Sequence, residues 1–251
     1  MNRVIPCLLM RDGGLYKGAA FKNHRYVGDP FNAVRVFNGF EVDELALLDI
    51  GASLQGRVID HEYIQQVASE CFIPLTVGGG VKTVEQARKL LQCGAEKIVI
   101  NSALFDDPSM ISRMAEAFGS QSVVVSVDVG KPLFGGYAVY SHSGTRKQKV
   151  SLTDWVTELE RRGAGELLLT SVDREGSMGG LDTKLISQVS SLVKIPVVAA
   201  GGAGSLSDIK QAMNAGANAV SAGAMFVFHG ERRAVLISYP ERCELESVLD
   251  I

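Results

Sequence analysis

Short apolar runs alternate with amphipathic stretches along most of the chain. Eight of these runs have the length and the β-branched content of buried strands, and they cover residues 4–9, 44–50, 75–77, 97–100, 123–128, 166–170, 197–199 and 219–222. The stretches between them predict helices over 30–39, 55–71, 108–118, 152–162 and 183–192, and two more that begin after the capping residues Thr83 and Ser205. Eight strand–helix alternations in 251 residues predict a closed (β/α)8 TIM barrel, organised as a single domain over residues 1–251.

The pattern also repeats within the chain. Residues 73–80 return as 195–202, which lie 122 positions later (195 minus 73), and at the same offset residues 93–102 align with 215–224 without a gap. Each copy predicts a strand, a glycine-rich turn, a helix and a second strand, so we expect two related half-barrels. Glycine turns let backbone N–H groups approach an anion, and one turn on each half suggests a ligand with a phosphate at each end. The alternative is that these glycines only relieve crowding where the chain turns.

Three segments depart from the alternation of strands and helices. Residues 11–29 predict a long irregular loop, in which Lys17 either meets an anion or lies in solvent. Residues 131–150 predict an inserted hairpin, with turn signals at 135–136 and 143–144. The divergent tail over about 230–251 contains a β-leaning run but predicts no definite structure.

Composition and charge exclude several classes of protein. The net charge of −3 argues against a nucleic-acid partner, and no apolar run approaches the ~20 residues that span a membrane. The first residues lack the apolar core of a secretory signal, and the four cysteines show no paired spacing, so we expect a cytoplasmic protein with reduced thiols. None of the four histidines has the spacing of a metal site, and we expect neither a metal nor a cofactor.

The active site of such a barrel lies at the carboxyl ends of its strands. Asp128 closes the fifth predicted strand and is the best acid–base candidate, because burial there would raise the pKa of its carboxyl group. The alternative is an aspartate that only binds a neighbouring loop. The other candidates lie at or just past strand ends: Leu9, Asp49, Gly80, Asn101, Ser102, Thr170, Glu175, Gly201, Gly202, Gly223 and Ala224.

A second set of polar residues lies at the opposite ends of the strands. Arg3, Glu44, Lys97 and Glu166 open the first, second, fourth and sixth predicted strands. Four charges of alternating sign could form a closed ring of ion pairs over the barrel axis. They could also be a solvated rim, since this end of a barrel normally contributes stability.

Together these motifs resemble the cyclase subunit (HisF) of imidazole glycerol phosphate synthase, from about Arg3 to Phe228. The residues that carry the resemblance are Lys17-Gly18, residues 27–30, 43–45, 48–50, 76–80, 100–101, 118–121, 161–166, 170–171, 173–174 and 201–204. The resemblance implies a glutaminase (HisH-like) subunit that docks under the barrel and releases ammonia. It further implies that Arg3, Glu44, Lys97 and Glu166 gate the ammonia.

The resemblance also assigns roles at the carboxyl ends. Phosphate-holding loops of the family match Gly80, Asn101–Ser102, Gly202 and Ala222–Ala224, which implies a phosphorylated small-molecule substrate. The family uses two aspartates as acid and base. One matches Asp128, but the other position, at the end of the first strand, is Leu9. Loss of one member of such a pair removes a factor of about 10²–10⁴ in rate.

Leu9 beside a retained gate favours a diverged paralogue. We expect an ammonia-channelling subunit of a glutamine amidotransferase complex that serves sugar amidation in surface-polysaccharide (O-antigen, lipopolysaccharide) biosynthesis, with a third amidating enzyme. One alternative is an ammonia-dependent lyase, the cyclase of histidine biosynthesis, which the phosphate loops favour. The other is a non-catalytic activator of a glutaminase. Smaller departures from the family are Glu175 in place of Asp, and Ala200 and Ala224 in place of hydroxyl residues.

Overall fold

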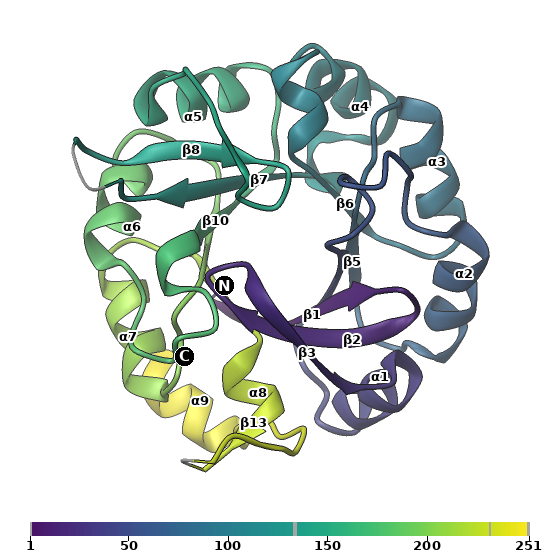
Figure 1. Ribbon diagram of the computed structural model, residues 1–251, viewed down its shortest axis with the longest axis vertical. Helices are drawn as coiled ribbons and strands as arrows, with labels where there is room; N and C mark the ends of the chain where they lie inside the picture. The colour runs from purple at the N-terminus through teal and green to yellow at the C-terminus, as the bar shows by residue number, and fades with distance from the viewer. Residues whose placement is uncertain (1, 133–134, 231, 250–251) are drawn as a thin grey trace.

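Eight parallel strands of the chain close into a barrel. The computed structural model describes residues 2–132, 135–230 and 232–249. In spatial order the barrel strands are β1 (Arg3–Arg11), β4 (Leu45–Asp49), β5 (Leu75–Gly78), β6 (Lys97–Ile100), β7 (Val123–Gly130), β10 (Glu166–Ser171), β11 (Val197–Ala200) and β12 (Ala219–Ala222). The pairing of β12 with β1 and of β7 with β10 completes the ring. The predicted (β/α)8 barrel is confirmed, and Figure 1 shows the strands inside a ring of helices.

The outer helices follow the strands and cover the outside of the barrel (Figure 1). They are α1 (Pro30–Gly39), α2 (His61–Glu70), α3 (Val84–Gln92), α4 (Met110–Phe118), α5 (Leu152–Arg161), α6 (Thr183–Ser190) and α7 (Leu206–Asn214). Most begin after a residue whose side chain accepts a backbone N–H of the first turn, namely Asp29, Asp60, Thr83, Ser151, Asp182 and Ser205. Such caps satisfy amide groups that the helix itself leaves unbonded. The two copies of the sequence repeat fold alike, as β5–α3–β6 and β11–α7–β12.

The helix predicted over 55–71 is shorter than expected. α2 begins only at His61, because the side chain of Asp60 accepts the N–H of Tyr63 at 2.9 Å and caps the helix there. The preceding residues turn around Asp49, whose Oδ1 accepts the N–H groups of Gly51 and Ala52 at 2.9 and 3.1 Å. Hydrogen bonds of this local kind compete with helix formation, and they cannot be predicted from the pattern of apolar and polar residues.

The prediction of a long irregular loop over 11–29 is wrong. This segment forms β2 (Gly14–Ala19) and β3 (Lys22–Gly28), an antiparallel hairpin that pairs with the end of β1. Asp12 and Gly13 make the first turn with φ of 48° and 76°, a pattern that the Asp-Gly pair favours and that the hydropathy pattern missed. β3 is mostly exposed and polar, so it lacks the alternation by which strands are found.

The segment 131–150 extends one side of the barrel. β8 (Ala138–Ser141) pairs antiparallel with the end of β7 and then with β9 (Arg146–Lys147). His142, Ser143 and Gly144 form the turn between β8 and β9. Leu133 and Phe134 of the predicted hairpin lie outside the described residues, as do Glu231, Asp250 and Ile251 of the tail.

The tail completes the outer layer of helices. After α8 (Ala224–Val227), the short strands β13 (Phe228–His229) and β14 (Ala234–Val235) lead to α9 (Arg242–Leu249), which packs beside α7 (Figure 1). Tyr239 attaches the segment between β14 and α9 to the barrel. Its ring contacts Phe226 and Phe37, and its hydroxyl donates to the carbonyl of Val4 at 2.9 Å. Residues for which the sequence predicted no structure therefore cover the eighth side of the barrel.

Apolar side chains are divided between two cores. The larger core lies between the strands and the helices, and a smaller layer inside the barrel contains Ile5, Ala46, Val99, Val124, Leu168, Val198 and Ala219. Neighbouring side chains of a strand point to opposite faces of the sheet. Residues two positions before or after the inner layer therefore also face the barrel axis, which positions the functional candidates at both ends.

The packing of Tyr239 predicts a loss of stability in Tyr239→Ala. The change removes ring contacts and one hydrogen bond, so we expect the free energy of unfolding to fall by about 2–4 kcal/mol, measured by urea denaturation. Phe72→Ala is the matched control, because the Phe72 side chain is 85% exposed and its loss should change stability by less than about 0.5 kcal/mol. Equal effects of the two changes would contradict the role of Tyr239.

Candidate functional site

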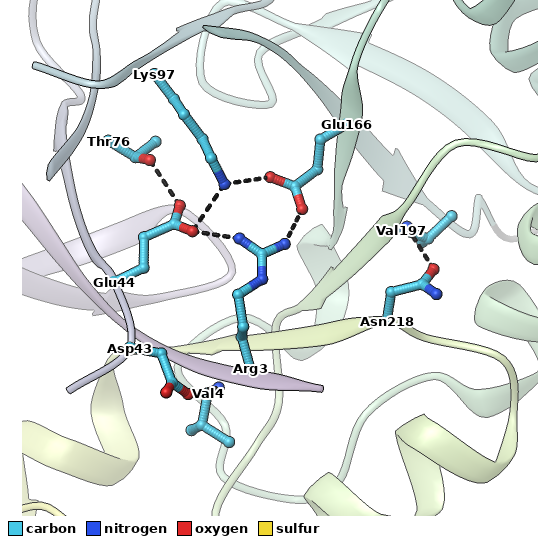
Figure 2. A network of polar contacts seen from close by, with 9 residues as sticks. All are labelled: Arg3, Val4, Asp43, Glu44, Thr76, Lys97, Glu166, Val197 and Asn218. Atoms are coloured by element: carbon cyan, nitrogen blue, oxygen red, sulfur yellow. Dashed lines mark hydrogen bonds and ion pairs between the residues drawn. The ribbon is translucent and has the colours of Figure 1, made fainter. Parts of the chain in front are cut away.

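Four charged side chains form a closed ring of ion pairs at the amino ends of the strands (Figure 2). Lys97 Nζ lies 2.8 Å from Glu44 Oε2 and 3.0 Å from Glu166 Oε2. The guanidinium of Arg3 donates through Nη1 to Glu44 and through Nη2 to Glu166. The sequence left open whether these four residues form a closed ring of ion pairs or a solvated rim. In the structure they form the closed ring.

Charges in the ring balance one another, two cations against two carboxylates. Glu44 and Glu166 are buried, whereas Arg3 and Lys97 are each 21% exposed and can be reached from the amino-end face. Burial alone would lower the pKa of Arg3, but attraction to Glu166 and then to Glu44 exceeds it, so the pKa lies above its ordinary value. Thr76 Oγ1 donates a further hydrogen bond to Glu44 Oε1 at 2.6 Å. Buried charges need such partners, and here each carboxylate has at least two.

A cavity of about 700 Å³ opens at the carboxyl ends of the strands. Val99 and Leu168 of the inner apolar layer line it, and each lies two residues past a member of the charged ring. Two residues of strand span about 7 Å, so a single apolar layer separates the ring from the cavity. The cavity brings together every candidate predicted at this end: Leu9, Lys17, Asp49, Gly80, Asn101, Ser102, Asp128, Thr170, Glu175, Gly201, Gly202, Gly223 and Ala224.

Asp128 is held near the end of β7 with 6% of its surface exposed. Its Oδ1 accepts a hydrogen bond from Ser126 Oγ at 3.1 Å, and its Oδ2 accepts one from Asn101 Nδ2 at 2.8 Å. Burial raises the pKa of Asp128 to about 6, although the bonds from Ser126 and Asn101 favour the ionised form. A carboxyl group with this pKa can exchange a proton near neutral pH.

Leu9 occupies the corresponding position on β1. It is buried, lies in register with Leu48 of β4 and lines the cavity with Cys7 and Arg11 of its own strand. The alternation along β1 therefore directs an aliphatic side chain, rather than a carboxyl group, toward the reaction space.

Two further ionisable side chains lie on the part of the cavity wall near β1 and β12. Lys17 is 4% exposed, and its Nζ fills the space above Gly223 that a side chain there would need. Glu175 is also buried, and its Oε2 has no hydrogen-bond partner among the described residues. Burial raises the pKa of the Cys7 thiol above its ordinary value. The nearby charge of Lys17 opposes this shift, and that of Glu175 adds to it. The buried side chains of Lys17 and Glu175 thus share this side of the cavity with the part-buried thiol of Cys7.

The glycine turns are crowded. A side chain at Gly80, where φ is +65°, would overlap the carbonyl of Arg57, and one at Gly202, where φ is +111°, would overlap the carbonyl of Gly180. Close packing therefore explains glycine at both positions without a ligand. Phosphate binding at these turns stays a prediction.

Several residues of the cavity wall were not predicted. His24 belongs to β3, which was expected to be irregular, and burial lowers its pKa. His142 belongs to the turn between β8 and β9. Ser126 and Ser221 lie two residues before Asp128 and Gly223, so the period of two along β7 and β12 could have identified them.

The described residues place limits on other kinds of site. They contain no group of three or more His, Cys, Asp or Glu side chains arranged to hold a metal ion. Within the described ranges, no helix combines the length and the apolar character that crossing a bilayer requires. The cysteines are free thiols.

Comparison with known proteins gives matches over nearly the whole chain. The model of the family described as histidine biosynthesis protein matches residues 3–232. A Pseudomonas aeruginosa protein provisionally named imidazole glycerol phosphate synthase subunit hisF2 is 50% identical over 246 residues, which are 98% of each chain. A Vibrio vulnificus protein provisionally named subunit hisF3 is 46% identical over 252 residues, covering 100% of this chain and 97% of the relative. Imidazole glycerol phosphate synthase subunit HisF of Thermotoga sp. is 43% identical over 227 residues, covering 90% of this chain and 89% of the relative.

Asp128→Asn tests the raised pKa. With a pKa of about 6 in the folded protein against an ordinary value of 3.8, the protonated carboxyl stabilises the fold fully below pH 3.8, and this contribution is lost as pH rises through 6. Asn does not titrate. The stability of the variant relative to wild type should therefore rise by about 2–2.5 kcal/mol between pH 4 and pH 8, measured by urea denaturation across that range. A difference that does not change with pH would contradict the shift.

Lys97→Met tests charge balance in the ring. It leaves two buried carboxylates with one cation, so we expect a loss of about 3–5 kcal/mol in the free energy of unfolding. The double variant Lys97→Met/Glu166→Gln removes one charge of each sign and should recover part of this loss. Absence of any recovery would show that the loss comes from packing rather than from unpaired charge.

Proposed function

The chain belongs to the histidine biosynthesis protein family, and we propose that it acts as the ammonia-channelling barrel of a glutamine amidotransferase complex. The observation that carries the proposal is the order of features along the axis. A closed ring of four charges lies at one end, a single apolar layer lies above it, and the cavity with Asp128 lies above that layer. In this proposal Arg3, Glu44, Lys97 and Glu166 gate the entry of ammonia.

The proposed source of ammonia is a glutaminase (HisH-like) subunit on the amino-end face. Phe72, in the connection before β5, is 85% exposed, and Phe40, after α1, is also exposed. The backbone N–H of Phe72 donates to Asn38 Oδ1 at 3.1 Å, which holds the backbone here while the side chain is exposed. Aromatic side chains are enriched at protein interfaces.

The proposed acceptor is a phosphorylated small molecule in the cavity. Gly80, Asn101 and Ser102 would hold one phosphate group, and the opposite half-barrel would hold the other through Gly201, Gly202, Gly223 and Ala224. The buried ammonium group of Lys17 would balance part of the negative charge. Thr170 and Glu175 would contact the part of the substrate between the phosphates.

Leu9 supports a role apart from histidine synthesis. With no carboxyl group at the end of β1, Asp128 lacks the partner that the cyclase reaction of the family uses. We therefore assign the ammonia to a sugar amidation in surface-polysaccharide (O-antigen) biosynthesis, carried out with a third amidating enzyme. The suffixed names hisF2 and hisF3 of two relatives fit such paralogues.

A second candidate is the cyclase of histidine biosynthesis itself, an ammonia-dependent lyase that forms imidazole glycerol phosphate and an aminoimidazole carboxamide ribonucleotide. The relative named HisF from Thermotoga sp. favours this candidate, and Glu175 offers the cavity another buried carboxyl group. A third candidate is a barrel that only stimulates its glutaminase and turns over no substrate with ammonia.

Leu9→Asp separates the first two candidates. With the bis-phosphorylated ribonucleotide of the cyclase reaction and free ammonia, we expect the variant to turn over substrate about 10²–10⁴-fold faster than wild type, because it restores the second proton-transfer group. Leu9→Asn is the matched control, since Asn is polar and of the same size as Asp but cannot act as an acid or a base near neutral pH. Wild-type turnover of about 1–10³ s⁻¹ would instead establish the histidine-pathway cyclase.

A further inference from the structure

The turn between β8 and β9 reaches the part of the cavity mouth formed by β4 and β6. The backbone N–H of His142 donates to Ser102 Oγ at 3.0 Å, and Ser143 Oγ donates to the carbonyl of Ile50 at 3.1 Å. His142, Ser143 and Gly144 have φ of 51°, 53° and 75°, so the turn is sharp. These contacts hold His142 beside Ser102, which follows β6, although 40 residues separate the two in the chain.

A chain of hydrogen bonds orients the imidazole of His142. Gln148 Nε2 donates to Ser141 Oγ at 2.6 Å, and Ser141 Oγ lies 2.8 Å from His142 Nδ1. Because Ser141 accepts from Gln148, its own O–H is free to donate to Nδ1, and its complete burial excludes competing water. An accepting Nδ1 leaves the proton of a neutral imidazole on Nε2. His142 lines the cavity, and its Nε2 makes no hydrogen bond to any described residue.

The hydroxyl of Ser102 is prepared in a similar way. It accepts the N–H of His142, so its own hydrogen remains available for a ligand. A hydroxyl that already accepts a hydrogen bond is a stronger donor, because bonds in a chain polarise one another. Two donors, one from the turn and one from the barrel, therefore line the same cavity.

We infer that His142 Nε2–H and Ser102 O–H together bind one phosphate group of the substrate. This inference rests on the phosphorylated acceptor of the proposed function, and it adds a recognition residue from the inserted hairpin. Ser141 and Gln148 act as positioning residues, because they select the tautomer in which Nε2 is the donor. Hydrogen bonds to a charged acceptor are stronger than neutral ones, so each donor contributes measurably to affinity.

Titration of the protein with inorganic phosphate tests the inference. With ¹⁵N-labelled histidine, phosphate should shift the Nε2 resonance of His142 in the wild type. We expect His142→Ala to weaken phosphate binding about five- to tenfold and His142→Gln to restore part of it, because the glutamine amide can place a donor near the position of Nε2. Gln148→Leu should mix the two tautomers of His142, seen in the same spectra. Lys149→Ala is the control, since this exposed lysine of the hairpin lies outside the cavity and should leave binding unchanged.

The outcomes separate this inference from the proposed function. If Ser102→Ala weakens phosphate binding but His142→Ala does not, the phosphate site stands and the inference is overturned. If phosphate leaves the His142 resonance unmoved while it binds elsewhere in the cavity, the inference is again overturned. If wild type binds no phosphate at all, the phosphorylated substrate of the proposed function fails, and the inference fails with it.

Discussion

Alternation of side chains along the parallel strands is the constraint on which the interior of this barrel depends. Each strand contributes every second residue to the axis, so a polar, an apolar and a reactive level follow one another at a spacing of about 7 Å. Along β6 and the residue that follows it the levels are Lys97, Val99 and Asn101, and on β10 they are Glu166, Leu168 and Thr170. A shift of one residue in the register of a strand would place its charged group in the apolar core outside the barrel, where it would lie among apolar side chains.

Much of the fold could be read from the sequence because this alternation and the helix caps leave strong local patterns. The barrel strands and most of the helices fall where apolar runs and caps such as Thr83 and Ser205 place them. β2 and β3 were missed because β3 is exposed and polar, so the pattern of apolar and polar residues does not indicate its pairing with β2. α9 was missed for a related reason, since its place beside α7 depends on tertiary packing rather than on its own sequence.

The candidate site was predictable to the extent that it follows strand ends. Asp128 and Leu9 could be placed because each ends an apolar run, and the charged ring because each member begins one. His142 was missed, and whether Lys17 met a ligand or lay in solvent stayed open, since both residues reach the cavity from hairpins whose paths depend on long-range pairing. Spacing also could not distinguish a paired ring from a solvated rim, because that difference lies in side-chain geometry across four strands.

Separation of the ring from the cavity by one apolar layer has a consequence for what can cross the barrel. An ion that enters this layer must give up its hydration shell, and the effective penalty for a buried unpaired charge is several kcal/mol. Neutral ammonia gives up much less than ammonium, so in the proposed function Ile5, Val99, Leu168 and their neighbours would select by protonation state rather than by size. Ammonia that took the proposed route would reach Asp128 as a free base, already able to act as a nucleophile.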